Sequence, residues 1–257
     1  MDRVDRLSGQ VVLVSGAARG MGAACARRLV ADGAAVVAGD VRRDDVSALA
    51  GELGPRCAAV TLDVVDPESW ASAVEVATTR FGELSALINN AGILRRTPIA
   101  DGDVDAYRQL VDVNQLGVYL GMRAVAPSMT TAGRGAIVNV SSIDGLLGMA
   151  GLAGYVSTKW AVRGMTKVAA LELGPSGVRC NSVHPGYIDT PMLTVEGRMR
   201  EETKRRLAAQ VPGGTMGTPD DIAAVCAFLV SDDSRYVNGA EIVVDGGLIA
   251  GIHPAGA

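Results

Sequence analysis

The stretch Gln10–Asp40, QVVLVSGAARGMGAACARRLVADGAAVVAGD, contains the pattern that decides the fold. Its first six residues form a continuous apolar run of strand length, which leads directly into the glycine-rich turn GAARGMG at 16–22. The spacing predicts a helix from Met21 to about Asp32, closed by Gly33, and a second strand over 34–40. Strand, glycine turn, helix and strand in this order are typical of a dinucleotide-binding unit.

The chemistry of this unit explains its residue types. Glycines let the backbone turn tightly and approach a pyrophosphate, while the helix N-terminus supplies unpaired amides and the positive end of a dipole. Asp40, at the end of the second strand, is placed to bond both hydroxyls of an adenosine ribose and to repel a 2′-phosphate. Arg42 and Arg43 could instead meet a phosphate, but the carboxylate favours NAD over NADP.

The alternation of strands and helices continues along the rest of the chain. We predict strands over 57–64, 86–92, 135–142, 178–186 and 240–247. We predict helices over 46–53, 67–81, 103–129 and 220–230, and one that carries Tyr155 and runs to about Leu173. The predicted fold is therefore an α/β Rossmann-type, doubly wound parallel sheet of about seven strands, with helices on both faces and one domain over 1–257.

Residues 190–218 differ from this pattern because they are rich in charge, methionine and glycine. They predict a short helix and a flexible segment that closes over a substrate as a lid. The alternative is a solvated surface helix.

Composition narrows the classes of partner. The formal net charge is −4 with no long basic run, so we expect no nucleic-acid surface. The four cysteines are far apart and predict buried, reduced thiols, and the two histidines give no basis for a metal site. The charged N-terminus and the absence of a long apolar run predict a cytoplasmic protein that does not engage a membrane.

A second constellation lies in SSIDGLLGMAGLAGYVSTK, 141–159. Tyr155 and Lys159 are four residues apart, which on a helix places them on one face. A lysine ammonium at that distance favours the phenolate and is expected to lower the tyrosine pKa. Ser142, at the end of the preceding strand, could meet a substrate oxygen. A tyrosine and a lysine at this spacing are, on their own, more often an ordinary feature of a solvated helix face. Here the dinucleotide-binding unit upstream favours the catalytic interpretation.

Two polar residues elsewhere are open to more than one interpretation. Asp63 could bond the adenine amino group or cap the helix that begins at Pro67. Asn114 interrupts the apolar face of the helix predicted over 103–129, so it is expected to hold a neighbouring backbone, or a water, near Lys159.

These motifs together resemble the short-chain dehydrogenase/reductase family, in the family's order and over almost the full chain. Within the family, HPGYIDTPM (184–192) and GYVSTKWAVRG (154–164) look most like bacterial 3-alpha,20-beta-hydroxysteroid dehydrogenases, although many 3-oxoacyl-carrier-protein reductases share the motifs. The matching segments are SGAARGMG (15–22), Asp63, NNAG (89–92), Asn114, Ser142, YVSTK (155–159), HPG (184–186) and VDGG (244–247).

The resemblance implies a catalytic tetrad. It makes Tyr155 the general acid/base and Lys159 the group that lowers the Tyr155 pKa and binds the nicotinamide ribose. It makes Ser142 the group that holds the substrate oxygen, and Asn114 the organiser of a water near Lys159. It further implies that the dinucleotide lies along Gly16, Arg19, Gly20, Met21, Gly22, Asp40, Asp63, Val64, Asn90, Ala91, Gly92, Tyr155, Lys159, Pro185, Gly186, Ile188 and Thr190.

The implied activity is NAD-dependent interconversion of a small apolar secondary alcohol, such as a hydroxysteroid, and its ketone. An NADPH-dependent 3-oxoacyl-carrier-protein reductase and a non-catalytic dinucleotide sensor are the alternatives. Relatives are commonly tetramers through the two long helices, here 103–129 and 154–173, so a homotetramer is expected. Asp189 stands where relatives vary, which leaves the substrate side open.

Overall fold

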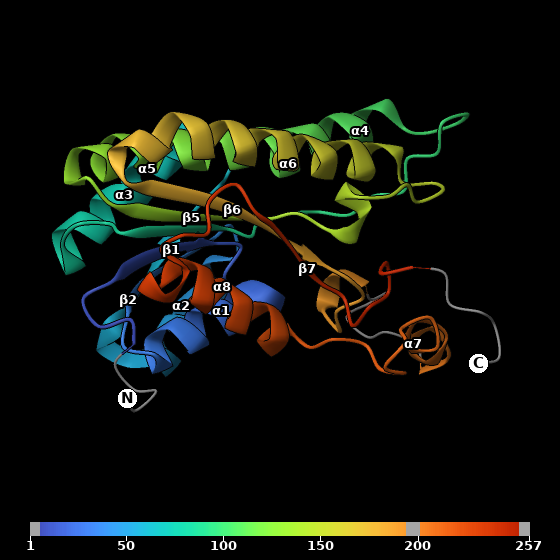
Figure 1. The fold of residues 1–257 in the computed structure, drawn as a ribbon, viewed down its shortest axis with the longest axis horizontal. Helices are drawn as coiled ribbons and strands as arrows, with labels where there is room; N and C mark the ends of the chain where they lie inside the picture. Colours follow the sequence, from blue (N-terminus) through green and yellow to red (C-terminus); the bar gives the residue numbers. More distant parts are fainter. Residues whose placement is uncertain (1–5, 194–200, 252–257) are drawn as a thin grey trace.

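The computed structural model describes residues 6–193 and 201–251 (Figure 1). Seven strands form one parallel sheet in the order β3-β2-β1-β4-β5-β6-β7. The strands are β1 (Val11–Ser15), β2 (Ala35–Asp40), β3 (Cys57–Thr61), β4 (Ala86–Asn89), β5 (Gly135–Val140), β6 (Val178–Pro185) and β7 (Glu241–Val244).

The strand order reverses at the centre of the sheet. Leu13 of β1 pairs with Val37 of β2 on one side and with Leu87 of β4 on the other. From β1 the chain moves outward to β3, then returns to β4 and continues outward to β7. Parallel sheets of this kind form a crevice outside the carboxyl ends of the strands at the reversal point, where ligands bind.

Helices cover both faces of the sheet, as the apolar strands require (Figure 1). One core joins the sheet to α1 (Gly20–Ala31), α2 (Arg43–Leu53) and α8 (Pro219–Val230). The opposite core joins it to α3 (Pro67–Phe81), α5 (Gly117–Ala132) and α6 (Ala153–Leu173). The doubly wound α/β fold predicted from the sequence is confirmed.

The start of α3 decides one of the alternatives left open by the sequence. The helix begins at Pro67, as predicted, but its cap is Asp66, whose Oδ1 accepts from the backbone N–H of Glu68 at 3.0 Å. Asp63 is therefore not the cap. Its Oδ1 accepts instead from the N–H of Val65 at 3.1 Å and shapes the turn before the helix.

The helix predicted over 103–129 is confirmed, with one π-helical turn in its middle that we did not predict. Helix α4 (Val104–Val111) ends in a π-helical turn, Asp112–Leu116, before α5 begins. Asn114 lies in this turn and is fully buried. A π turn inserts an extra residue into the helix and redirects its backbone, which is common at functional sites.

The predicted lid, 190–218, is described only in part. A short 3-10 turn (Pro191–Leu193) and α7 (Glu201–Ala208) belong to the structure, whereas 194–200 lie outside the described residues. Lys204 of α7 forms an ion pair with Asp189, which follows β6. The predicted short helix is thus confirmed, and it is tethered to the end of β6.

All four cysteines are free and buried, as predicted. In the described ranges, no helix combines the length and the apolarity that crossing a membrane requires.

Candidate active site

The glycine turn between β1 and α1 forms a cradle that only glycine can line. Gly16 has a φ of +67°, and a Cβ there would lie 2.7 Å from the Cα of Ala91. A Cβ on Gly22 would lie 2.1 Å from the carbonyl oxygen of Gly16. The close backbone approach expected of a dinucleotide-binding turn is therefore present, and it also packs the start of α1 against the turn.

A hydroxyl at the end of β1 joins this turn to β4. Ser15 Oγ accepts from the backbone N–H groups of Asn90, at 3.1 Å, and Ala91, at 3.2 Å. Asn90 Nδ2 in turn donates to the carbonyl oxygens of Ser15 and Gly16, both at 3.0 Å. These four bonds fix the two central strands at the point where the strand order reverses.

Asp40 closes the other side of the cradle. Its carboxylate is 8% exposed, with Oδ2 accepting from the N–H of Ala18 at 3.0 Å and Oδ1 from the N–H of Arg42 at 2.9 Å. The Arg42 side chain lies at the same rim and pairs with Asp45 at 3.2 Å. The acidic residue predicted to face the ribose is thus held rigidly beside the glycine turn, next to an arginine that is already ion-paired.

These elements enclose a crevice of about 450 Å³ at the carboxyl ends of the central strands. Leu62, Ile93 and Val113 also line it, although we did not predict them from the sequence. The predicted cofactor residues that line it are Gly16, Arg19, Gly20, Met21, Asp40, Asp63, Val64, Asn90, Ala91, Gly92 and Thr190.

The other predicted cofactor residues lie around this crevice without lining it. Gly22 is under the turn, and Tyr155 and Lys159 lie on α6. Pro185 ends β6, and Gly186 packs against Asp245, whose Cβ would lie 2.6 Å from a Cβ on Gly186. Ile188, 4% exposed, pairs with Gly217 as an isolated bridge. From there the chain reaches Thr190, whose side chain lies 3.7 Å from a Cβ built on Gly20 and so faces the glycine turn.

Ser142, Tyr155 and Lys159 come together beside the crevice. Ser142 follows β5, while the other two lie one turn apart near the start of α6. Lys159 Nζ lies 5.6 Å from the centre of the Tyr155 ring and donates to the carbonyl oxygen of Val140 at 2.9 Å. A Cβ on Gly92 would lie 3.8 Å from Lys159 Nζ, which brings the lysine to the edge of the dinucleotide crevice.

The Asn114 side chain holds the backbone of a neighbouring segment. This is the first of the two roles that we expected for it, the other being to hold a water. Its Oδ1 accepts from the N–H of Ile93 at 2.8 Å, and its Nδ2 donates to the carbonyl oxygen of Ile93 at 2.9 Å. The π turn thereby fixes the segment after β4 next to Lys159.

Burial dominates the electrostatics of the tetrad, contrary to our expectation for Tyr155. Burial raises the pKa of the Tyr155 phenol to about 12; the Ser142 hydroxyl lowers this pKa and the charge of Asp144 raises it. Burial also lowers the pKa of Lys159 to about 8, against the opposing effect of Asp144. The predicted lowering of the Tyr155 pKa is therefore wrong, because the loss of water around the phenol raises this pKa and Lys159 is not among the groups that shift it.

His184 positions Ser142, although the sequence showed it only as part of a motif. The fully buried imidazole lies with Nδ1 2.9 Å from the carbonyl oxygen of Ser142 and Nε2 2.9 Å from the hydroxyl of Ser182. Burial lowers the pKa of His184, which favours the neutral ring. A neutral ring that donates from Nδ1 to the carbonyl satisfies both contacts.

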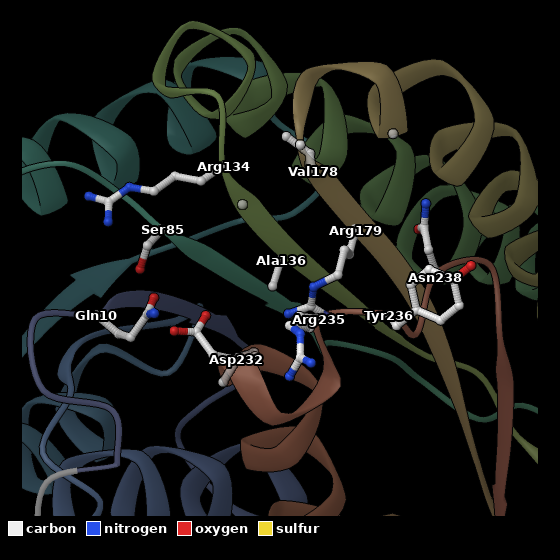
Figure 2. Close-up of a pocket in the computed structure, with 14 residues that line it drawn as sticks. Gln10, Ser85, Arg134, Ala136, Val178, Arg179, Asp232, Arg235, Tyr236 and Asn238 are labelled. Carbon is white, nitrogen blue, oxygen red and sulfur yellow. The ribbon is translucent and has the colours of Figure 1, made fainter.

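A larger cavity, of about 710 Å³, lies at the opposite edge of the sheet (Figure 2). It is lined by residues at the amino ends of β5 and β6 and by the segment after α8, including Ala136, Val178 and Arg235. The Arg179 guanidinium there donates to the carbonyl oxygens of Leu229 at 3.0 Å and Ser231 at 3.2 Å. The bonds of Arg179 join the end of α8 to the sheet. None of the predicted site residues lines this cavity.

Comparison with known proteins agrees with this geometry. The family model described as "Enoyl-(Acyl carrier protein) reductase", a short-chain dehydrogenase model, matches residues 16–249. The chain belongs to the short-chain dehydrogenase/reductase family. It is thus an oxidoreductase that acts on CH–OH groups with a nicotinamide dinucleotide.

Individual relatives in the short-chain dehydrogenase/reductase family cover nearly the whole chain. The chain is 48% identical to a 3-alpha-(or 20-beta)-hydroxysteroid dehydrogenase of Mycobacterium tuberculosis, over 96% of this chain and 92% of the relative. It is 43% identical to a trans-4-hydroxycyclohexanecarboxylate dehydrogenase of Sinomonas cyclohexanicum, over 98% and 97% of the two chains. It is 38% identical to a cyclohexanol dehydrogenase of Acinetobacter sp., over 94% and 96%.

Proposed function

We propose that the protein is an NAD-dependent dehydrogenase that interconverts a secondary alcohol on an apolar ring, such as a hydroxysteroid or a cyclohexanol, and the corresponding ketone. The observation that carries this proposal is the meeting of Ser142, Tyr155 and Lys159 at the edge of the crevice that the glycine turn and Asp40 form. The names of the relatives support a secondary alcohol of a cyclic molecule, because they name a 3-alpha-(or 20-beta)-hydroxysteroid, a trans-4-hydroxycyclohexanecarboxylate and cyclohexanol.

The crevice fits a nicotinamide dinucleotide. Gly16 and Gly22 pack too tightly to carry a Cβ, which holds the turn and the start of α1 in the geometry that a pyrophosphate requires, and Gly20, with a φ of +57°, lines the crevice itself. Asn90 Oδ1 is buried without a hydrogen-bond partner among the described residues, which leaves an acceptor at the same place. When bound, the dinucleotide supplies the hydride chemistry, while the protein binds, orients and polarises.

Each member of the tetrad has a separate task in this proposal. The Ser142 hydroxyl holds the substrate oxygen, and Tyr155 removes the hydroxyl proton in oxidation or donates it in reduction. The Lys159 ammonium binds the nicotinamide ribose. Asn114 fixes the backbone at Ile93, which keeps the floor of the crevice in place beside Lys159.

Asp40 supports NAD over NADP. Its carboxylate is fixed by the amides of Ala18 and Arg42, so it cannot turn away from a 2′-phosphate without losing both bonds. The Arg42 guanidinium is paired with Asp45 and so offers less to a phosphate. The competing proposal, an NADPH-dependent 3-oxoacyl-carrier-protein reductase, shares only the carrier protein with the description of the matching family model, which names the reduction of an enoyl group.

A substrate panel tests the proposal. We expect turnover of cyclohexanols and hydroxysteroids with NAD, weaker turnover with NADP, and loss of nearly all turnover in Tyr155→Phe with dinucleotide affinity retained. A preference for NADPH and 3-oxoacyl thioesters would favour the carrier-protein alternative. Dinucleotide binding without turnover over the whole panel would identify a sensor, and full turnover by Tyr155→Phe would refute the catalytic assignment.

We also propose that the chain assembles as a homotetramer. Apolar side chains of α4, α5 and α6 are exposed on the face away from the sheet, among them Val104 at 61%, Tyr119 at 50% and Leu171 at 78%. Exposed apolar faces of this kind mark interaction surfaces. Light scattering at micromolar concentration tests the proposal, and a monomer there would contradict it.

A further inference from the structure

The carboxylate of Asp144 is a buried charge beside the site that the proposed mechanism does not use. It lies two residues after Ser142, in the 3-10 turn Ile143–Gly145 between β5 and α6, and is 8% exposed. Its Oδ1 is buried and has no hydrogen-bond partner within 6–193 and 201–251. A buried carboxylate oxygen without a partner is costly, so it requires an explanation.

The turn that carries Asp144 is fixed against the part of α6 that carries Lys159. Ser141 Oγ donates to the carbonyl oxygen of Lys159 at 2.9 Å, and Arg163 donates to the carbonyl oxygen of Gly145 at 2.7 Å. A Cβ on Gly145 would lie 2.9 Å from the same Lys159 carbonyl oxygen. The contact is therefore so close that Asp144 cannot withdraw from the helix without moving Ser141 and Gly145.

Asp144 also contacts the catalytic serine directly. Its backbone N–H donates to Ser142 Oγ at 3.1 Å. This bond occupies a lone pair of the serine oxygen and leaves the hydroxyl proton for another acceptor. The backbone of Asp144 thus orients Ser142, which leaves the role of its side chain open.

Lys159 is a buried cation that needs a counter-charge. It is 4% exposed, and the bond described for its Nζ goes to the neutral carbonyl of Val140. Burial lowers its pKa, and the charge of Asp144 opposes that lowering. The effect is mutual, since Lys159 lowers the pKa of Asp144, which burial raises. The two groups therefore stabilise each other's charged forms.

Other ionisable groups around Asp144 are compensated or neutral. Arg163 is paired with Glu241 at 2.9 Å, and the same glutamate pairs with Lys167 at 3.0 Å. Burial lowers the pKa of His184, and Asp144 raises the pKa of Tyr187, as it does for Tyr155. The groups on the elements around Asp144 are Tyr155, Lys159 and Arg163 of α6, His184 of β6, Tyr187 after β6, and Glu241 of β7.

We propose that Asp144 is a positioning residue whose carboxylate keeps Lys159 in its ammonium form while the protein binds its dinucleotide. The proposal rests on the proposed function for the role of the ammonium, but its electrostatic part concerns only Asp144 and Lys159. The same carboxylate opposes formation of the Tyr155 phenolate. Asp144 therefore favours dinucleotide binding and moves proton removal from the alcohol by Tyr155 toward higher pH.

Nuclear magnetic resonance of labelled lysine tests the electrostatic part without activity or cofactor. The sequence contains three lysines, Lys159, Lys167 and Lys204. With 13C at the ε-carbon, their signals are assigned from Lys167→Arg and Lys204→Arg. We expect Lys159 to titrate near pH 8 in the wild type, and about one pH unit lower in Asp144→Asn, which has the same shape without the charge.

Three further measurements keep the test decisive. Asp144→Glu should restore the wild-type midpoint, and Glu172→Gln, which removes a charge from an exposed position of α6, should leave it unchanged. An unchanged Lys159 midpoint in Asp144→Asn would overturn the proposal. If that variant does not fold by circular dichroism, the wild type decides, because its Lys159 signal must show a second step when Asp144 titrates in acid. A single step would overturn the proposal.

Dinucleotide affinity then separates this proposal from the proposed function. In Asp144→Asn, the pH above which NADH affinity falls should move about one unit toward acid relative to the wild type. An equal loss at every pH would indicate a purely structural role and would contradict the proposal. If the wild type binds no NADH while Lys159 still responds to Asp144, the proposed function fails and the coupling between the two residues stands.

Discussion

Asp40→Asn tests how the chain selects its dinucleotide, because it keeps the shape of the side chain and removes its charge. A like charge close to a buried carboxylate costs about 1–3 kcal/mol. The ratio of kcat/KM for NAD to that for NADP should therefore fall about 5- to 150-fold. The assay is the oxidation of one ring alcohol, such as cyclohexanol, with each dinucleotide at matched concentrations.

The structure also gives the cost of this substitution in stability. Both carboxylate oxygens of Asp40 accept from backbone amides, of Ala18 and Arg42, whereas an asparagine has one oxygen and one amino group. One of the two N–H groups then faces another donor, at a cost of about 1–3 kcal/mol. The midpoint temperature of thermal unfolding should fall by about 2–4 °C for each kcal/mol of folding stability lost.

A matched control is the exposed Asp44, in the first turn of α2, which does not line the crevice. Asp44→Asn removes the same charge close by in the chain and should leave the dinucleotide preference unchanged, at a cost in stability of about 0.3–1 kcal/mol for an exposed acidic group at a helix N-terminus. The reasoning would be refuted if Asp40→Asn retained the wild-type preference for NAD, or if Asp44→Asn changed that preference equally.

Three other predictions follow from the site. In Gly22→Ala the new Cβ would lie 2.1 Å from the carbonyl oxygen of Gly16, so we expect loss of dinucleotide binding and a lower urea concentration at the unfolding midpoint. Gly51→Ala is the control: its Cβ would meet nothing within 4 Å, so the stability of the protein should stay the same or rise. Asn114→Ala leaves the buried N–H and carbonyl groups of Ile93 without their partner, which should cost about 1–3 kcal/mol in urea unfolding, and unchanged stability would contradict this. Because the pKa of Lys159 is about 8, its ammonium is present below that pH and lost above it, so NADH affinity measured by fluorescence should fall above pH 8. Lys159→Met should bind NADH weakly at every pH, and a fall in its affinity near pH 8 like that of the wild type would contradict this role of Lys159.

The sequence predicts this fold well where one element decides a boundary locally. The apolar run before Ser15 is a strand buried along its whole length, and Pro67 begins α3 as expected. The cap of α3 was within reach of the same rules, since Asp66 immediately precedes the proline at the first helical position. Our prediction considered only Asp63 as the cap, although Asp66 lies closer to the proline and is the residue that caps the helix.

Features that depend on tertiary contacts were not predicted. The π turn around Asn114 exists together with its two bonds to Ile93, which lies 21 positions away in the chain. The pKa of Tyr155 depends on how completely α6 and the turn after Ser142 exclude water from the phenol. The spacing of residues along a helix does not indicate how deeply a side chain is buried. The orphaned oxygen of Asp144 likewise became visible only once its surroundings were known.

The hydroxyl of Ser15 has a consequence for how this scaffold can change over evolution. Its bonds to Asn90 and Ala91 close the seam between the two halves of the sheet and, through the same atoms, form the base of the ligand crevice. Variation there would damage folding before it altered recognition. At the rim, Asp40 bonds the backbone of Ala18 and Arg42 and makes no bond across the seam, so new dinucleotide preferences should arise by drift at that rim while the central seam stays unchanged.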